Sequence, residues 1–371
     1  FFQLHPITAI YQMSLIFSLC MVSLLAPYGQ ALRTVSGVKT GTVSAAVRDK
    51  LLQVRRKAVM AHNLMGTSLW TAEVNDFSDK TDAERKAFRG YRSFSGLPHQ
   101  PSVGAFSFIQ VKSEEHASLP AEIVDRRNDL RSAHFVRMQG QCGSCWAMAA
   151  VGALEMRLEI EHGNATELSW EELTDCVPNP DECGGDGGCT GATAELAFKY
   201  VSNHGIASAD DYYEDLADTG VASTCRKDVR RTMQVQDYVK LPANQAMPLL
   251  QAVANEGPVV SAVHSSGWFE YGYGIYDSCP LDAIVDHAVL IVGYGKENTF
   301  RGETLYWIIR NSWGTDWGEE GFIRVLRHPD NVTYCGTDTD PSIGAGCKGG
   351  PSEVQVCGMC GILYDVVSVA M

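Results

Sequence analysis

The chain has 371 residues, of which 45% are apolar and 20% are charged, and it carries a formal net charge of −14. This composition is typical of a folded globular protein and excludes a disordered or collagen-like chain. The length exceeds that of a typical single domain, so we expect one large folded unit with an accessory segment. The acidity argues against nucleic-acid binding.

The basic residues are concentrated near the N-terminus. Residues 32–118 contain 13 Lys and Arg against 8 Asp and Glu, which gives a charge of +5. Residues 119–371 contain 17 against 36, which gives −19. We therefore expect the N-terminal segment and the body of the chain to be electrostatically complementary.

The first 31 residues are predicted to be a secretory signal with its leader. An apolar run begins at Met13 and ends before Gly29-Gln30-Ala31, whose small residues suit cleavage after Ala31. A membrane anchor is the alternative, and no other segment is long enough to span a bilayer. Residues 1–12 precede this run, and we expect no structure for them.

Residues 32–118 are expected to be mainly helical. Apolar residues recur at helical spacing over 44–63, which predicts one amphipathic helix. A second, charged helix is predicted around 81–89. The Gly-, Ser- and Pro-richer stretch from Ser93 to Val103 indicates a linker.

From Leu119 onward, helices come first and strands second. A long helix is predicted from Cys145 to Glu161, ending at Gly163, and others begin at Ser169 and Thr193. Strands are predicted near 258–263, 288–294 and 305–310. This order predicts an α+β protein with two unlike halves.

Cys145 is the candidate nucleophile. It lies in Gln139-Gly-Gln-Cys-Gly-Ser-Cys-Trp146, at the start of the predicted long helix. Unpaired N–H groups and the positive end of the helix dipole stabilise a thiolate there. A buried structural cysteine is the alternative interpretation.

A thiolate that attacks an amide needs a partner to protonate the leaving nitrogen. His287, 142 residues after Cys145 and at the start of a predicted strand, is the candidate. Asn311, in Arg310-Asn-Ser-Trp-Gly314, can hold its imidazole in one tautomer, with Trp313 as a shield from water. The Gln139 amide can donate to an oxyanion together with the Cys145 backbone N–H.

The chain has twelve cysteines. Setting aside Cys20 in the signal and Cys145 leaves ten, which predicts five disulfides in an oxidising compartment. A zinc site at Cys357-Gly-Met-Cys360 is the alternative, although no second ligand pair accompanies it.

These motifs resemble the papain family of cysteine proteases over residues 119–371, as the Cys-Gly-Ser-Cys-Trp signature and the spacing to His287 indicate. Asn311, at 166 residues, lies beyond the usual window, which we attribute to an extra loop from Lys296 to Glu303. The N-terminal segment resembles the family's prodomain, with Asn75, Phe77, Asp79, Thr81 and Glu84 in one motif and Arg48, Leu52, Val59 and Asn63 in another. Ser44 and Arg55 depart from that second motif.

The resemblance implies a papain-like two-domain fold with a helical left half, an antiparallel β-barrel-like right half and a cleft between them. Residues 32–118 are then an inhibitory propeptide, removed at acidic pH, and residues 119–371 the peptidase domain. The implied disulfides are Cys142–Cys189, Cys176–Cys225 and Cys279–Cys360. Cys183, Cys335, Cys347 and Cys357 would form two further bridges, of open pairing, that staple an added loop at 329–359.

The resemblance also implies a pocket for the second residue upstream of the cleaved bond, with Asp365 at its floor. A carboxylate there would accept Arg or Lys as well as hydrophobic side chains. The alternative is an Asp365 carboxylate turned to solvent. The expected substrate-binding residues are Gly191, Ala192, Ala194, Ala262, Ala288, Trp313 and Asp365.

We therefore expect a secreted or lysosomal cysteine endopeptidase made as a zymogen, which acts as a monomer on protein or peptide substrates without metal or cofactor. Endopeptidase activity is favoured because no long His-His insertion lies between Tyr200 and Cys225. The sequons at Asn164 and Asn331 are candidate glycosylation sites. A non-enzymatic binding protein and a transpeptidase are the rival interpretations. Aminolysis by an added amine would identify the transpeptidase.

Overall fold

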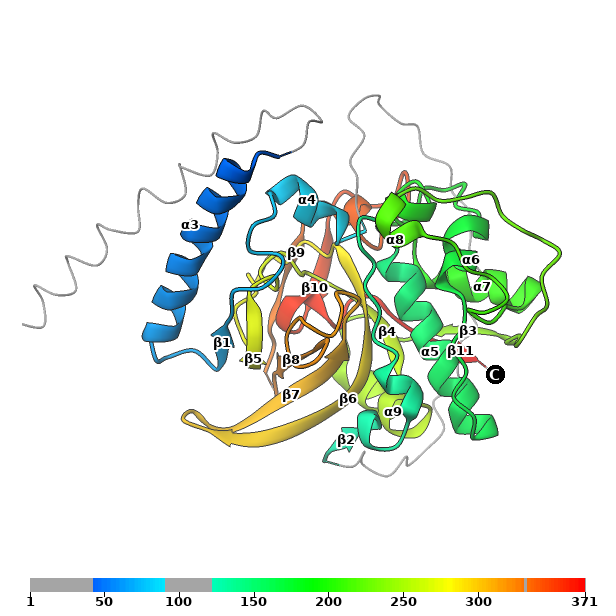
Figure 1. Ribbon diagram of the computed structural model, residues 1–371. Coiled ribbons are helices and arrows are strands. Elements are labelled where there is room, and N and C mark those ends of the chain that lie inside the picture. The colour runs from blue at the N-terminus through cyan, green and yellow to red at the C-terminus, as the bar shows by residue number, and fades with distance from the viewer. Residues whose placement is uncertain (1–42, 91–121, 330–331, 371) are drawn as a thin grey trace, which may run out of the picture. The chain divides into compact units, whose positions relative to one another are not determined.

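The computed structural model describes residues 43–90, 122–329 and 332–370 (Figure 1). Residues 48–371 form one compact unit, whose boundary falls inside the first helix described. The predicted signal, the Ser93–Val103 linker and the sequon residue Asn331 lie outside the described residues. Within the described residues, no helix combines the length and the apolar character needed to cross a membrane.

The described part of the N-terminal segment, residues 43–90, contains two α-helices and a short strand, α3 (Ala45–Leu64), β1 (Trp70–Ala72) and α4 (Asp82–Ala87). Both helices were predicted within two residues of these bounds. The α4 helix begins with a capping box, in which the Thr81 side chain accepts from the Glu84 N–H and the Glu84 carboxylate accepts from the Thr81 N–H.

The central helix α5 (Cys145–His162) ends at Gly163, whose φ of 73° is the left-handed conformation that glycine adopts freely. Its side chains are buried on nearly all sides, because the helix lies between the other helices and the sheet. Ser169 caps the next helix by accepting from the Glu172 N–H. The remaining α-helices are α6 (Trp170–Cys176), α7 (Ala194–His204), α8 (Leu216–Thr219) and α9 (Ala246–Asn255).

The main sheet has the strand order β1-β5-β8-β7-β6-β4-β11-β3, with β2 paired to β6. All of its pairs are antiparallel except β5 with β8. Its strands are β2 (Val124–Asp125), β3 (Asp237–Lys240), β4 (Val259–Val263), β5 (Tyr271–Tyr276), β6 (His287–Thr299), β7 (Gly302–Arg310), β8 (Phe322–Arg327) and β11 (Val366–Ala370). The expected α+β class is thus confirmed.

Lys296 to Glu303 was expected to be an extra loop, and this expectation was wrong because most of the segment is β-strand. The β6–β7 ladder continues through this segment, from Lys296 opposite Leu305 to Thr299 opposite Gly302. The polar residues therefore extend a two-stranded ribbon whose turn lies at 300–301 (Figure 1).

Two hydrophobic cores lie on either side of the region where α5 meets the sheet. One surrounds α5 and includes Trp146, Leu154 and Phe198. The other lies within the sheet half and includes Trp268 and Trp307. The first core is shared by the helices and the sheet, since it also includes Leu290, Ile308 and Val367, and the second also includes Leu249 of α9.

Five disulfides join the ten cysteines other than Cys145 in the described residues. Cys357 and Cys360 belong to different bridges, so both sulfurs of the possible zinc motif are used in disulfides. The pairs are Cys142–Cys189, Cys176–Cys225, Cys183–Cys347, Cys279–Cys360 and Cys335–Cys357.

The added segment at 329–359 contains a two-stranded ribbon, β9 (Cys335–Asp338) with β10 (Val354–Cys357). The Cys335–Cys357 bridge closes this ribbon. The chain between the two strands includes a 3₁₀ turn at Pro341–Ile343 and then reaches Cys347, which is bonded to Cys183 of the helical half.

Candidate active site

Cys145 is the first residue of α5 and carries a free thiol. The N–H of Gly143, two residues earlier, donates to the Cys189 carbonyl at 2.9 Å, and Cys142 is bonded to the same cysteine. The preceding loop is therefore fixed, which places the Cys145 thiol at the positive end of a long helix.

His287 is the first residue of β6, and its Nε2 lies 2.7 Å from the Asn311 Oδ1. Because an amide oxygen only accepts, this contact requires the proton on Nε2. The Trp313 ring centroid lies 5.2 Å from that of His287, and Trp313 is 1% exposed. His287 Nδ1 is buried without a hydrogen-bond partner among the described atoms, while His287 and Cys145 line the same cavity.

Gln139 is fully buried beside this group. Its Nε2 donates to the Cys142 carbonyl at 3.0 Å, and its Oε1 accepts from the Ser312 hydroxyl at 2.6 Å. These two bonds fix the orientation of the amide. One N–H of the amide then remains for an oxyanion, because an amide nitrogen has two.

Burial governs the ionisation of both reactive groups in this structure. It raises the pKa of the Cys145 thiol to about 12 and lowers the pKa of His287 to about 4. The Arg89 guanidinium contributes to the second effect. Both groups are therefore neutral at pH 7 in this structure, in which the N-terminal segment lies against Cys145 (the closed state). This disfavours a thiolate-imidazolium pair.

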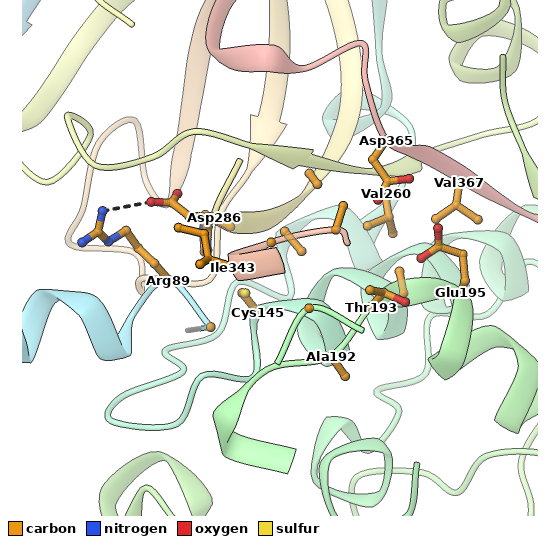
Figure 2. Close-up of a pocket in the computed structure, with 18 residues that line it drawn as sticks. Arg89, Cys145, Ala192, Thr193, Glu195, Val260, Asp286, Ile343, Asp365 and Val367 are labelled. Carbon is orange, nitrogen blue, oxygen red and sulfur yellow. Dashed lines mark hydrogen bonds and ion pairs between the residues drawn. The ribbon is translucent and has the colours of Figure 1, made fainter. Parts of the chain in front are cut away.

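The N-terminal segment contributes to this burial. A Cβ added to Gly90 would lie 2.8 Å from the Cys145 sulfur, and Gly90 has a φ of +67°, so both space and conformation require glycine there. The neighbouring Arg89 forms an ion pair of 2.9 Å with Asp286, next to His287 in the chain (Figure 2). Phe88 accepts a hydrogen bond from Trp313 Nε1 at 3.0 Å.

A cavity extends from Cys145 and His287 to Asp365 (Figure 2). Five predicted substrate-binding residues line it, namely Ala192, Ala194, Ala262, Ala288 and Asp365. The other two lie elsewhere. Gly191 packs against the Gly90 carbonyl, and Trp313 covers the His287–Asn311 contact.

Asp365 is buried but is not a lone carboxylate. Lys240 Nζ, from β3, lies 2.6 Å from Asp365 Oδ1 and 2.8 Å from Glu195 Oε1. Sequence reasoning missed Lys240, because it is 125 residues before Asp365 and belongs to no motif. Asp365 and Glu195 line this end of the cavity, and the Lys240 ammonium pairs with both without being one of the lining residues.

The three groups shift one another's protonation. Burial and the Glu195 charge raise the pKa of Asp365 to about 6. Burial also raises the pKa of Glu195, but the Lys240 ammonium outweighs it and holds that pKa below its ordinary value. Protonation of Asp365 as the pH falls therefore removes one negative charge from this end of the cavity.

A family model described as "Papain family cysteine protease" matches residues 119–345. The chain belongs to the papain family. It is 35% identical to cathepsin S of Mus musculus over 297 residues, covering 78% of this chain and 81% of that protein. A cathepsin L-like proteinase of Phaedon cochleariae is 34% identical over 298 residues, covering 78% of this chain and 83% of the relative.

Solved structures of papain-family precursors also match. Digestive procathepsin L 3 from the larval midgut of Tenebrio molitor has a TM-score of 0.67 at 26% identity, covering 93% of this chain and 98% of that one. The likeness to a precursor confirms the papain-like fold preceded by a helical N-terminal region. This papain-family chain is therefore a cysteine peptidase precursor.

Proposed function

We propose that this precursor matures to a peptidase in which Cys145 is the nucleophile, His287 the acid and base, and Asn311 the residue that orients His287. The observation that carries the proposal is the position of a free thiol at the α5 N-terminus in one cavity with a histidine held by an asparagine. The family membership supports the same reaction.

In the proposed reaction the Cys145 proton moves to His287 and the thiolate attacks the scissile carbonyl carbon. The oxyanion accepts hydrogen bonds from the Cys145 N–H and Gln139 Nε2, and losing one such donor typically costs about 10²–10³ in rate. His287 then gives its proton to the leaving amine, which leaves a thioester on Cys145. Water, deprotonated by His287, hydrolyses the thioester and restores both side chains.

We further propose that residues 32–118 are the inhibitory propeptide and that residues 1–31 direct export to a lysosome, an acidic vacuole or the cell exterior. The closeness of Gly90 to the Cys145 sulfur supports inhibition, because no substrate carbonyl can reach the thiol while Gly90 is there. The five disulfides support an oxidising compartment. We propose that the mature peptidase, residues 119–371, is a monomer.

The pocket is proposed to accept both hydrophobic and basic side chains. Its alanines leave room for a large side chain, while Asp365 and Glu195 together exceed the single Lys240 charge. A substrate Arg or Lys would neutralise the remaining negative charge.

The test is acid incubation of the purified precursor with and without an epoxysuccinyl thiol-trapping inhibitor, followed by mass spectrometry. We expect loss of the N-terminal segment near residue 118, peptidase activity, and inhibitor mass on Cys145 alone. A Cys145→Ser precursor is the matched control and should neither mature nor be labelled. Label on another cysteine, or absence of both maturation and activity, would contradict the proposal.

A further inference from the structure

The segment 341–348 crosses from the sheet half to the helical half, and we call it the strap. On the sheet side, Asp338 at its base accepts from the Val285 N–H at 3.0 Å and from the Asp340 N–H at 2.8 Å. Gly344 packs against the Val285 carbonyl so closely that an added Cβ would lie 1.8 Å from that oxygen. The strap therefore begins fixed to the loop that precedes His287.

On the helical side the strap is attached covalently. Cys347 is bonded to Cys183, and the Gly184 N–H donates to the Gly346 carbonyl at 2.8 Å. The Lys348 N–H donates to the Asp181 carbonyl at 2.9 Å. The strap thus joins two loops that belong to opposite halves of the fold.

These two loops are also the walls of the cavity described above. Gly184 and Ala192 of the helical half and Asp286 of the sheet half all line it. Three strap residues, Ile343, Gly344 and Ala345, line the same cavity as Cys145 (Figure 2). The strap therefore contributes to the cavity that contains Cys145 and does not lie far from it.

Arg89 of the N-terminal segment lies on the other side of Cys145 from Asp365 (Figure 2). The acyl part of a substrate extends from Cys145 toward Asp365 instead, because the second upstream residue occupies that pocket. An extended chain advances about 3.3–3.6 Å per residue, so a third upstream residue would have to pass between the two walls that the strap joins.

We infer that the strap narrows the cleft beyond the second upstream residue, so that this peptidase releases dipeptides from substrates with a free amino terminus faster than it cleaves chains with more upstream residues. The inference rests on the proposed peptidase function of Cys145. In this reaction the dipeptide carbonyl forms the thioester with Cys145, the remaining peptide leaves with a proton from His287, and water releases the dipeptide as a free acid.

The test is a nested series of aminocoumarin substrates with the same Phe-Arg next to the reporter and two, three or four residues in total, each with a free amino terminus. For the acid-matured wild type, kcat/KM should be highest for the two-residue substrate and at least about tenfold lower for the longer ones, a difference of about 1.4 kcal/mol. Equal or rising kcat/KM with length would overturn the inference.

A Cys183→Ser/Cys347→Ser variant should narrow this difference, because the strap is then free to leave the wall near Gly184. Cys335→Ser/Cys357→Ser is the matched control. It removes the other disulfide of the insertion but keeps the link across the cavity, so its length preference should match the wild type. If both variants keep the length preference of the wild type, that preference does not depend on the link between the strap and Cys183.

The length series on the wild type keeps the inference testable if either variant fails to fold. The two failures also remain distinct. If no substrate is cleaved and Cys145 is not labelled, the proposed function is wrong. If Cys145 is labelled and the longer substrates are cleaved as well as the shortest, the strap inference alone is wrong.

Discussion

The reactive residues differ from the pocket residues in how far they can be predicted. Cys145, His287 and Asn311 each stand in a local motif whose chemistry is recognisable, and the fold brings the three together. Lys240 has no such motif. It reaches Asp365 only because β3 pairs with β11 antiparallel, placing Lys240 opposite Val367.

The pairing of Lys240 with two carboxylates makes it a determinant of the pocket charge. Lys240→Met should raise the preference for Arg over Phe at the second upstream position, because the substrate cation then replaces the lost ammonium. A hydrogen-bonded ion contact is worth about 1.5–3 kcal/mol, so the ratio of the two kcat/KM values at pH 7 should rise about tenfold or more. Asp365→Ala should lower the same ratio.

The control for this prediction is Lys199→Met. Lys199 lies on the neighbouring helix and pairs with Asp237 at 3.7 Å, but its side chain is 55% exposed. Such surface pairs are worth little, so its substitution should leave the ratio unchanged. An unchanged ratio in Lys240→Met would mean that the pocket charge does not select the substrate.

At the scale of elements, the N-terminal segment is held by strand pairing and by buried arginines. The β1 strand pairs antiparallel with β5, and Asn75 Nδ2 donates to the Phe269 carbonyl at 2.7 Å. Arg55, which departs from the family motif, is buried and donates to the carbonyls of Phe77 and Ser78. The Arg55 guanidinium thus holds α3 to the chain at Phe77 and Ser78, at a position where the family motif has a different residue.

Arg85 connects this segment to the body of the peptidase. Its guanidinium donates to the Phe77 carbonyl at 2.7 Å and pairs with Glu270. Arg85→Ala should weaken binding of the segment by about 2 kcal/mol, as expected for a charged hydrogen bond at a mostly buried site. We expect acid processing of the precursor to begin at a less acidic pH, measured by gel analysis across a pH series.

Arg56→Ala is the control for Arg85→Ala, because Arg56 is exposed on α3. Its processing profile should match the wild type. If Arg85→Ala also left the profile unchanged, the Arg85–Glu270 pair would not contribute to retaining the segment.

Two elements were harder to predict, for physical reasons. The β6–β7 extension reads as a loop, because Lys296 to Glu303 is polar, and only the facing strand supplies its hydrogen bonds. The added segment at 329–359 could be recognised from its three cysteines, but together with Cys183 they allow three pairings. The link to Cys183 depends on a contact between loops far apart in the chain.

At the scale of the whole molecule, the opposite charges of the two segments meet in specific ion pairs. Arg85 and Arg89 of the basic segment pair with Glu270 and Asp286 of the acidic body. Some of the opposite charges that give the two segments net charges of +5 and −19 therefore form direct ion pairs. We expect this attachment to depend on pH through His287, whose pKa is lowered in this structure.

His287 gives this pH dependence a defined window. Its pKa in the closed precursor is about 4, below the ordinary value of 6.5, because it is buried near Arg89. We expect release of the segment to expose His287 to water, so that its pKa rises toward the ordinary value. The closed state is therefore fully favoured above about pH 6.5 and loses up to about 1.4 kcal/mol per pH unit as the pH falls toward 4.

Glu84 acts in a lower range. Burial raises its pKa, but hydrogen bonds from Thr81 and Arg48 outweigh burial and hold the pKa below its ordinary value of 4.5. Because these partners lie within the N-terminal segment, Glu84 stabilises the fold of that segment above about pH 4.5, and this contribution is lost as the pH falls through the lowered pKa. Glu84→Gln should therefore loosen the segment at neutral pH and remove the lowest part of the pH dependence.

These two ranges can be separated in a precursor that cannot cleave itself. In Cys145→Ser, the N-terminal segment should open increasingly as the pH falls from 6.5 to about 4.5, and further below that. The opening is monitored by the fluorescence of Trp70 and Trp313 at the edge of the segment. Adding His287→Ala should remove the increase in opening between pH 6.5 and about 4.5, because the titrating group is gone. The increase below pH 4.5 should remain. An unaltered upper part would show that other carboxylates, and not His287, drive the opening.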